Sequence, residues 1–166
     1  EPPVWRVRLN LDFLKRIRKN HALEHATISI AHSRMEKPSI VAGNSTQSGF
    51  FVYGNVPTEV LSQAASEALK RLKAGERHLA ISPFCGTNLV VTATLTGLAC
   101  ALALGNQFRW KKMPGVIEVT LATLLISRPI GHFVQRHVTT DGDIGRMGIK
   151  GISHVGTGAL TVHRVR

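Results

Sequence analysis

The spacing of apolar residues predicts four helices of two kinds. In residues 11–34, apolar and histidine positions recur at steps of three or four, which places them on one face of a helix. Residues 58–73 have the clearest amphipathic pattern, with a single apolar stripe. Residues 86–105 and 113–134 are apolar on all sides, which is typical of helices surrounded by protein or by lipid.

Strand signals lie on both sides of these apolar helices. Residues 50–53 are rich in β-branched and aromatic side chains, and Gly43-Asn44-Ser45 before them reads as a turn. Residues 78–81 are a short strand candidate. Residues 147–152 and 159–165 flank the turn signal SHVGTG and predict a terminal β-hairpin. The polar part of the chain is therefore predicted to be α+β, with strands from both sides of the apolar insertion.

The apolar helices predict a membrane hairpin. Residues 86–105 contain no charge over 20 positions, about the length that crosses a hydrocarbon core of ~30 Å. The second run carries Glu118 and Arg128 only towards its ends, and Trp110 before it resembles an interfacial anchor. Two buried helices of a soluble protein remain the alternative.

These patterns give a division into three parts. Residues 1–83 are predicted to form an α+β domain, and residues 84–134 a two-helix transmembrane hairpin. Residues 135–166 are predicted to form a C-terminal β-hairpin that packs on the first domain. The fold class is therefore a small mixed α+β domain with a membrane hairpin inserted before its last two strands.

The charge of the chain indicates an anionic partner. Its formal net charge is +11, which suits a bilayer that contains anionic lipids. Aromatic residues make up only 5% of the chain and its cations form no single stripe, which argues against nucleic acid. Six basic residues flank the outer ends of the hairpin and three lie in its loop, so both terminal segments are predicted to be cytoplasmic. Protein partners within a membrane complex also fit this placement.

The candidate chemistry lies in the first predicted helix. His21, Glu24 and His25 form an H-x-x-E-H pattern. Residues four apart on a helix share a face, so both imidazoles can reach one metal ion. Glu24 is one turn from His21 and is the candidate catalytic residue, a general base for a metal-bound water. The other interpretation is a polar network in which two histidines and a carboxylate satisfy each other.

A metal site needs a third protein ligand. Cys85 is the first candidate, because a thiolate binds zinc, or alternatively iron, tightly. Glu59, Glu67 and Glu76 are the carboxylate alternatives. The predicted cofactor is therefore a divalent metal, zinc before iron.

These motifs resemble those of known families. The H-x-x-E-H pattern resembles that of the inverted zincins of pitrilysin type and the HTLEH segment of S-ribosylhomocysteine lyase. Residues 81–88, which carry Cys85, also resemble a cysteine-bearing segment of that lyase, where the cysteine serves acid–base chemistry. The inverted-zincin resemblance implies a hydrolase that takes a downstream glutamate as its third ligand.

Taken over its whole length, the chain resembles a family of small uncharacterised bacterial membrane proteins. That resemblance implies a membrane protein and assigns no reaction. It is carried by residues 18–27, 48–50, 53–54, 85–88 and 135–140.

Two functions follow from these signals. The first is a membrane-anchored metal-binding protein, in its finer form a metal-dependent hydrolase in which Glu24 deprotonates the attacking water. The second is a non-catalytic accessory subunit of a larger membrane complex, such as an energy-transducing one. Residue types and spacing leave open whether the protein is an enzyme.

Overall fold

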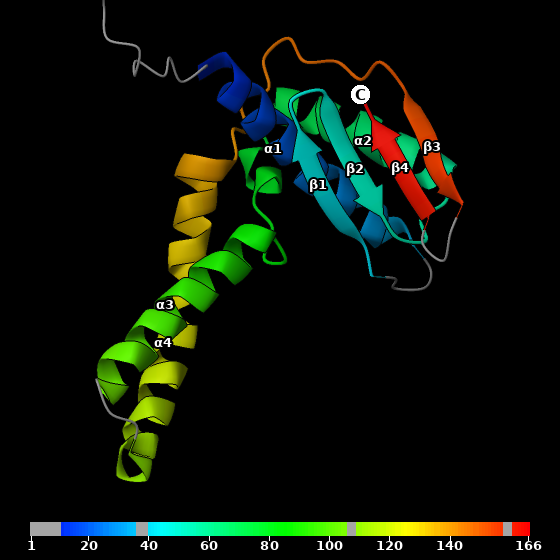
Figure 1. Cartoon of the computed structure of the whole chain (residues 1–166). Helices are drawn as coiled ribbons and strands as arrows, with labels where there is room; N and C mark the ends of the chain where they lie inside the picture. Colours follow the sequence, from blue (N-terminus) through cyan, green and yellow to red (C-terminus); the bar gives the residue numbers. More distant parts are fainter. Residues whose placement is uncertain (1–10, 36–39, 106–108, 158–160) are drawn as a thin grey trace, which may run out of the picture. The chain divides into compact units, whose positions relative to one another are not determined.

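The computed structural model describes residues 11–35, 40–105, 109–157 and 161–166 (Figure 1). The chain divides into two compact units, which are described separately. The first contains residues 1–80 and 140–166, and the second contains residues 81–139. The chain therefore leaves the first unit after its second helix and returns to it for its last two strands.

The first unit is a four-stranded antiparallel sheet covered on one face by two helices, α1 and α2 (Figure 1). The strand order is β1-β2-β4-β3, so a strand that precedes the second unit pairs with one that follows it. The predicted α+β class and C-terminal β-hairpin are confirmed. The elements are α1 (Leu11–Arg34), β1 (Ala42–Thr46), β2 (Gly49–Tyr53), α2 (Thr58–Lys73), the 3-10 helix η1 (Arg77–Ala80), β3 (Ile152–Thr157) and β4 (Thr161–Val165).

The core lies between the sheet and these two helices. Phe50 and Val52 alternate along β2 with partly exposed residues, and both are buried beneath the helices. Val165 of β4 is in register with Phe50 and extends the same apolar layer. Much of the helical side of the core is alanine, which lets α1 and α2 pack closely on each other and on the strands.

Two local predictions were wrong. Gly43, Asn44 and Ser45 belong to strand β1, and the chain turns at Gln47 and Ser48 instead. Residues 78–81 do not form a strand, because the backbone N–H of Leu79 donates to the carbonyl of Glu76 at 3.1 Å and closes a 3-10 turn.

The terminal hairpin is shifted along the sequence from its predicted position. Strand β3 begins at Ile152, so residues 147–151 lie before it, and most of the predicted turn is part of the strand. The end of that predicted turn and the start of the predicted last strand, residues 158–160, lie outside the described residues. The valine and threonine in this segment favour extended backbone over a turn; Thr157 pairs with Thr161 of β4, whereas Val155 lies at a register shift between His154 and Gly156.

The second unit is an antiparallel pair of apolar helices. Its elements are α3 (Gly86–Leu104), the 3-10 helix η2 (Trp110–Lys112), α4 (Met113–Val134) and the π-helix η3 (Gln135–Thr139). Hydroxyl and thiol groups link the two helices, with Thr92 Oγ1 donating to Ser127 Oγ at 2.9 Å and Cys100 Sγ 3.2 Å from Thr120 Oγ1. Small residues and interhelical hydrogen bonds of this kind suit close packing in a low-dielectric setting.

Both helical segments are long and apolar enough to cross a membrane. In the most apolar 18-residue stretch of Gly86–Leu104, 0% of the residues are buried. In the corresponding stretch of Trp110–Thr139, 6% are buried. The core helix of a soluble protein would be mostly buried. Leu102 and Leu125, for example, are each about three-quarters exposed. Neither helical segment is therefore buried within the described residues as the core helix of a soluble protein would be.

A buried histidine of strand β4 contacts the first residue of α2. His163 of β4 is fully buried, and its Nε2 lies 3.0 Å from the hydroxyl oxygen of Thr58. His154 of β3 is in register with it, and the two rings are 5.3 Å apart. Burial lowers the pKa of His163, and the nearby His154 lowers it further.

We expect the first unit to lose stability in mild acid because of His163. Above pH ~6.5, His163 is neutral in both folded and unfolded chains and contributes no pH dependence. Below that pH the unfolded chain takes up a proton that the folded chain resists, so stability falls, by at most about 1.4 kcal/mol per pH unit for one proton. Urea unfolding at pH 7.5 and 5.5 measures the loss. His163→Gln should reduce the slope, and an unchanged slope in that variant would contradict the assignment.

Candidate metal centre

Helix α1 places His21 and His25 side by side. Their ring centroids are 4.3 Å apart, with an angle of 61° between the ring planes. His25 is 5% exposed and His21 is half-buried. The structure therefore brings together the two imidazoles that the helical spacing predicts.

The hydrogen bond of His25 fixes which of its nitrogens is free to bind. Its Nδ1 lies 2.7 Å from the backbone carbonyl oxygen of Ala80. A carbonyl can only accept, so Nδ1 carries the proton and donates it. The neutral ring then presents the lone pair of Nε2. Metal-ligating histidines are held in this way by a backbone carbonyl on their other nitrogen.

The end of α2 explains why a carbonyl is available there. The helix stops at Lys73, and Gly75 follows with a φ of +96°, a conformation that favours glycine. The chain then forms η1, which ends at the buried Ala80 beside α1. The carbonyl of Ala80, which accepts the hydrogen bond from His25, lies 55 residues further along the chain. It reaches His25 because α2 ends at Lys73 and the chain then turns back towards α1.

Glu24 faces the sheet. Its side chain is 4% exposed, and its carboxylate accepts a hydrogen bond from Ser45 Oγ on β1. The carboxylate also lies over Gly43, where an added Cβ would be 2.0 Å from Glu24 Oε1. The described contacts of Glu24 are therefore to β1, whereas those of His25 are to η1.

A second polar residue of α1 also binds β1. Asn20 Nδ2 donates to the carbonyls of Thr46 and Gln47 at 2.7 and 3.2 Å. Together, Asn20 and Glu24 fix the rotation of α1 about its axis. The direction of the imidazoles is therefore set by polar contacts on the neighbouring face of the same helix.

Cys85 belongs to the second unit, where it is the N-cap of α3. Its Sγ accepts a hydrogen bond from the backbone N–H of Thr87 at 3.4 Å, and the residue is buried. A helix N-terminus favours a thiolate, the form of cysteine that binds metals. Cys85 is also the fifth residue after Ala80, the partner of His25. Five residues of extended chain span at most about 17 Å, which is the upper limit on the distance between Cys85 and Ala80 along the chain.

A network of amide groups holds the segment that carries Cys85. Gln135 is fully buried, and its side chain accepts from the N–H of Ser82 and donates to the carbonyl of Ser82, each at 3.0 Å. Gln135 Nε2 also donates to Asn88 Oδ1 at 2.7 Å, and Asn88 Nδ2 donates to the carbonyl of Pro83 at 2.9 Å. Gly131 leaves room for this network, because an added Cβ would be 2.3 Å from Asn88 Oδ1.

The carboxylate alternatives for the third ligand have other contacts or are exposed. Glu67 forms ion pairs with Arg34 and Arg71. Glu76 accepts two hydrogen bonds from Arg71 Nε at 2.9 and 3.0 Å, and this arginine lowers the pKa of its carboxyl. Glu59 is exposed in the first turn of α2. These environments favour the Cys85 thiol over the three carboxylates as the third metal ligand.

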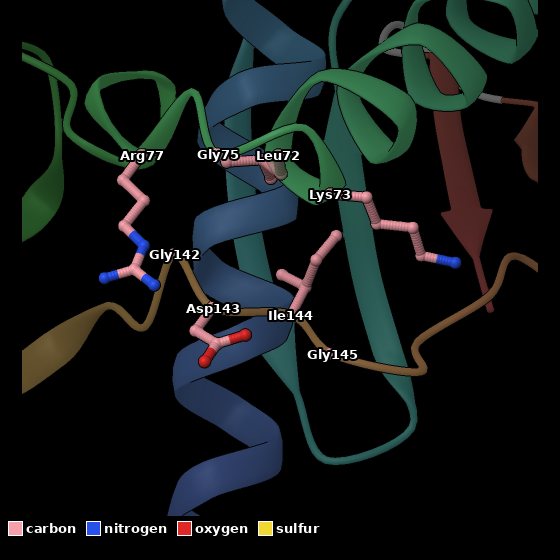
Figure 2. Close-up of a pocket in the computed structure, with 8 residues that line it drawn as sticks. All are labelled: Leu72, Lys73, Gly75, Arg77, Gly142, Asp143, Ile144 and Gly145. Atoms are coloured by element: carbon pink, nitrogen blue, oxygen red, sulfur yellow. The ribbon is translucent and has the colours of Figure 1, made fainter.

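The first unit also contains a shallow cavity of about 300 Å³ (Figure 2). Leu72 and Ile144 contribute apolar groups to its lining. Lys73 and Arg77 lie on opposite sides of it in Figure 2, and their charged ends point in different directions. Because these groups do not converge, the cavity is a weaker candidate for a ligand site than the histidine pair.

Comparison with known proteins now gives the family. Residues 16–152 match a family described as a domain of unknown function, DUF6391. The chain belongs to this family. An uncharacterised protein of Picosynechococcus sp. is 36% identical over 137 residues, which cover 75% of this chain and 65% of that protein. The chain thus spans about two thirds of the length of this relative. The predicted resemblance to an uncharacterised family is confirmed, and no solved structure matches the chain.

Proposed function

We propose that the protein is a membrane-anchored metal-binding protein in which His21, His25 and Cys85 bind one divalent cation. The observation that carries this proposal is the 2.7 Å hydrogen bond from His25 Nδ1 to the carbonyl of Ala80. It orients the ring and leaves Nε2 as a donor, beside the second imidazole at 4.3 Å.

Zinc is the metal that this donor set fits best. Two imidazoles and one thiolate are zinc ligands in known sites and leave one of four tetrahedral positions for water or a partner group. Ferrous iron is the second choice, because it accepts the same donors with lower affinity. The N-cap position of Cys85 supports the deprotonated thiol that either metal requires.

The exposed apolar helices support the membrane anchor. Both segments have the length of a membrane span, and their outer faces carry large apolar side chains. Trp110 is exposed at one end of the pair, next to Lys111 and Lys112, as expected at an interface with anionic lipids. The excess of basic residues at the opposite end supports a cytoplasmic location for the first unit.

The more specific form of this proposal is a metal-dependent hydrolase. The alternative is a non-catalytic accessory subunit of a larger membrane complex. The H-x-x-E-H pattern supports the hydrolase, because it places Glu24 within one helical turn of His21. The buried contacts of Glu24 with Ser45 and Gly43 support a positioning role instead. Glu24→Gln separates the two, since a hydrolase would keep its metal and lose turnover by about 10²–10⁴-fold.

Metal analysis of the purified full chain in neutral-lipid nanodiscs tests the proposal. We expect about one zinc per chain after incubation with zinc and desalting, and loss of that zinc in His21→Ala and His25→Ala, because two ligands cannot hold the ion tightly. His132→Ala is the matched control, since His132 is an exposed histidine of α4. Zinc-free wild-type protein, or retention of zinc by His25→Ala, would overturn the proposed site.

A further inference from the structure

The face of the sheet opposite the helices carries a row of four side chains, one from each strand. Asn44 of β1 is in register with Phe51 of β2, Phe51 with Arg164 of β4, and Arg164 with Ser153 of β3. Their neighbours along the strands point towards the helices, so these four side chains lie on the open face. All four are exposed or partly exposed.

The middle of this row is a stack of two aromatic rings and a guanidinium group. The ring of Phe51 stacks with that of Tyr53, with centroids 6.4 Å apart. The guanidinium carbon of Arg164 lies 5.3 Å from the Phe51 centroid, and Arg164 Nη2 donates to Ser48 Oγ at 3.2 Å. Two aromatic rings and a guanidinium plane are therefore already ordered side by side, with amide and hydroxyl groups at the ends of the row.

The acidic residues of the first unit lie outside its strands, whereas cations lie in both of its layers. None of the four strands contains Asp or Glu. Within the part of this unit that the structure describes, the acidic residues lie in the helices or in the segments that follow α2 and precede β3. The cations at the sheet have no acidic residue among the strands to neutralise them. The acidic residues are Asp12, Glu24, Glu59, Glu67, Glu76, Asp141 and Asp143, and the cations at the sheet are Lys150, Arg164 and Arg166.

We propose that this open face binds single-stranded nucleic acid, a function beyond the metal site. Bases would extend the stack formed by Tyr53, Phe51 and Arg164, and the cations would contact phosphates. Asn44 and Ser153 can hydrogen-bond base edges or sugar hydroxyls from the ends of the row. The counts of aromatic and basic residues along the sequence argued against nucleic acid, but folding gathers the relevant groups on one acid-free face.

Stacking groups favour nucleic acid over an anionic membrane at this face. The phosphate of an anionic lipid can pair with the Arg164 guanidinium, but its headgroup has no planar ring to stack on Phe51 and Tyr53. A membrane-docking surface would also expose large apolar side chains, and among the described strand residues only Val155 does so, at 55%. The occupant that uses every group of the row is a chain of bases and phosphates.

Fluorescence anisotropy with a labelled oligouridine 12-mer tests the inference, with the full chain held in nanodiscs of phosphatidylcholine. Arg164→Gln and Tyr53→Leu should each weaken binding about tenfold, and salt should weaken the wild-type complex steeply. Lys73→Gln removes the same charge from the helical layer and should change the Kd less than about twofold. Circular dichroism and the unfolding midpoint of each variant verify that the fold is kept.

Several results would overturn the inference. One is the absence of binding at low salt, and another is an equal loss in Lys73→Gln, which would indicate attraction by net charge alone. Equal affinity for a duplex of the same length would remove the role of stacking. Protection of the sheet face from hydrogen exchange by phosphatidylserine nanodiscs, but not by the oligonucleotide, would assign this face to lipid. None of these results affects the zinc stoichiometry, so the two proposals fail separately.

Discussion

Gly43→Ala should destabilise the first unit by about 3 kcal/mol, because the new methyl group would occupy the space of the Glu24 carboxylate. The added Cβ would lie 2.0, 2.4 and 2.7 Å from Oε1, Cδ and Cγ of Glu24. The whole end of that side chain must therefore move, although it is buried and hydrogen-bonded to Ser45. Chemical denaturation of the full chain in nanodiscs, followed by circular dichroism, measures the loss.

A double-mutant cycle makes this prediction specific to the pair. In a Glu24→Ala background, Gly43→Ala should cost less than about 1 kcal/mol, since the clash is gone. Gly148→Ala is the matched control, because among the described residues nothing lies within 4 Å of its added Cβ. Additive costs in the cycle, or an equal loss in Gly148→Ala, would show that the carboxylate does not occupy this position.

The same pair shows why part of the fold could be predicted and part could not. Two of the four long helices follow from apolar periodicity and two from long apolar runs, which are properties of neighbouring residues, and the structure has all four within a residue of their expected bounds. Gly43-Asn44-Ser45 has turn composition, yet the backbone is extended there because it pairs with β2, and the glycine leaves space for Glu24, 19 positions earlier. Local sequence does not report that a glycine is needed for space rather than for a turn.

The candidate site divides in a similar way. His21 and His25 converge because helical geometry requires it, and their spacing is visible in the sequence. The acceptor of His25 is a backbone carbonyl at Ala80, and no residue type marks it in advance. Gln135 reaches the Cys85 segment across 53 positions, so only the packing of α3 and α4 reveals it. The convergence of the two imidazoles was thus predictable, and the groups that orient the histidines and the Cys85 segment were not.

Cys85→Ser should weaken zinc binding by more than about 100-fold, the largest effect we expect outside the two histidines. A serine hydroxyl stays protonated at neutral pH, so the site would lose its only anionic donor. Gln135→Ala should weaken binding less, by about 10–100-fold, because it removes a group that positions the Cys85 segment without removing a ligand. Competition with a chromophoric zinc chelator measures both affinities.

Cys100 provides the internal control, since it is the second cysteine of the chain and lies within α3 beside Thr120. Cys100→Ser should leave zinc affinity unchanged.

Alkylation separates ligation from folding, because bound zinc should protect Cys85 from iodoacetamide in the wild type and in Cys100→Ser, but not in His25→Ala. Protection that persists in His25→Ala would show that the thiol is shielded by packing rather than by a metal. Wild-type affinity in Cys85→Ser would contradict Cys85 as the third ligand and leave Glu59, Glu67 or Glu76 as the candidates.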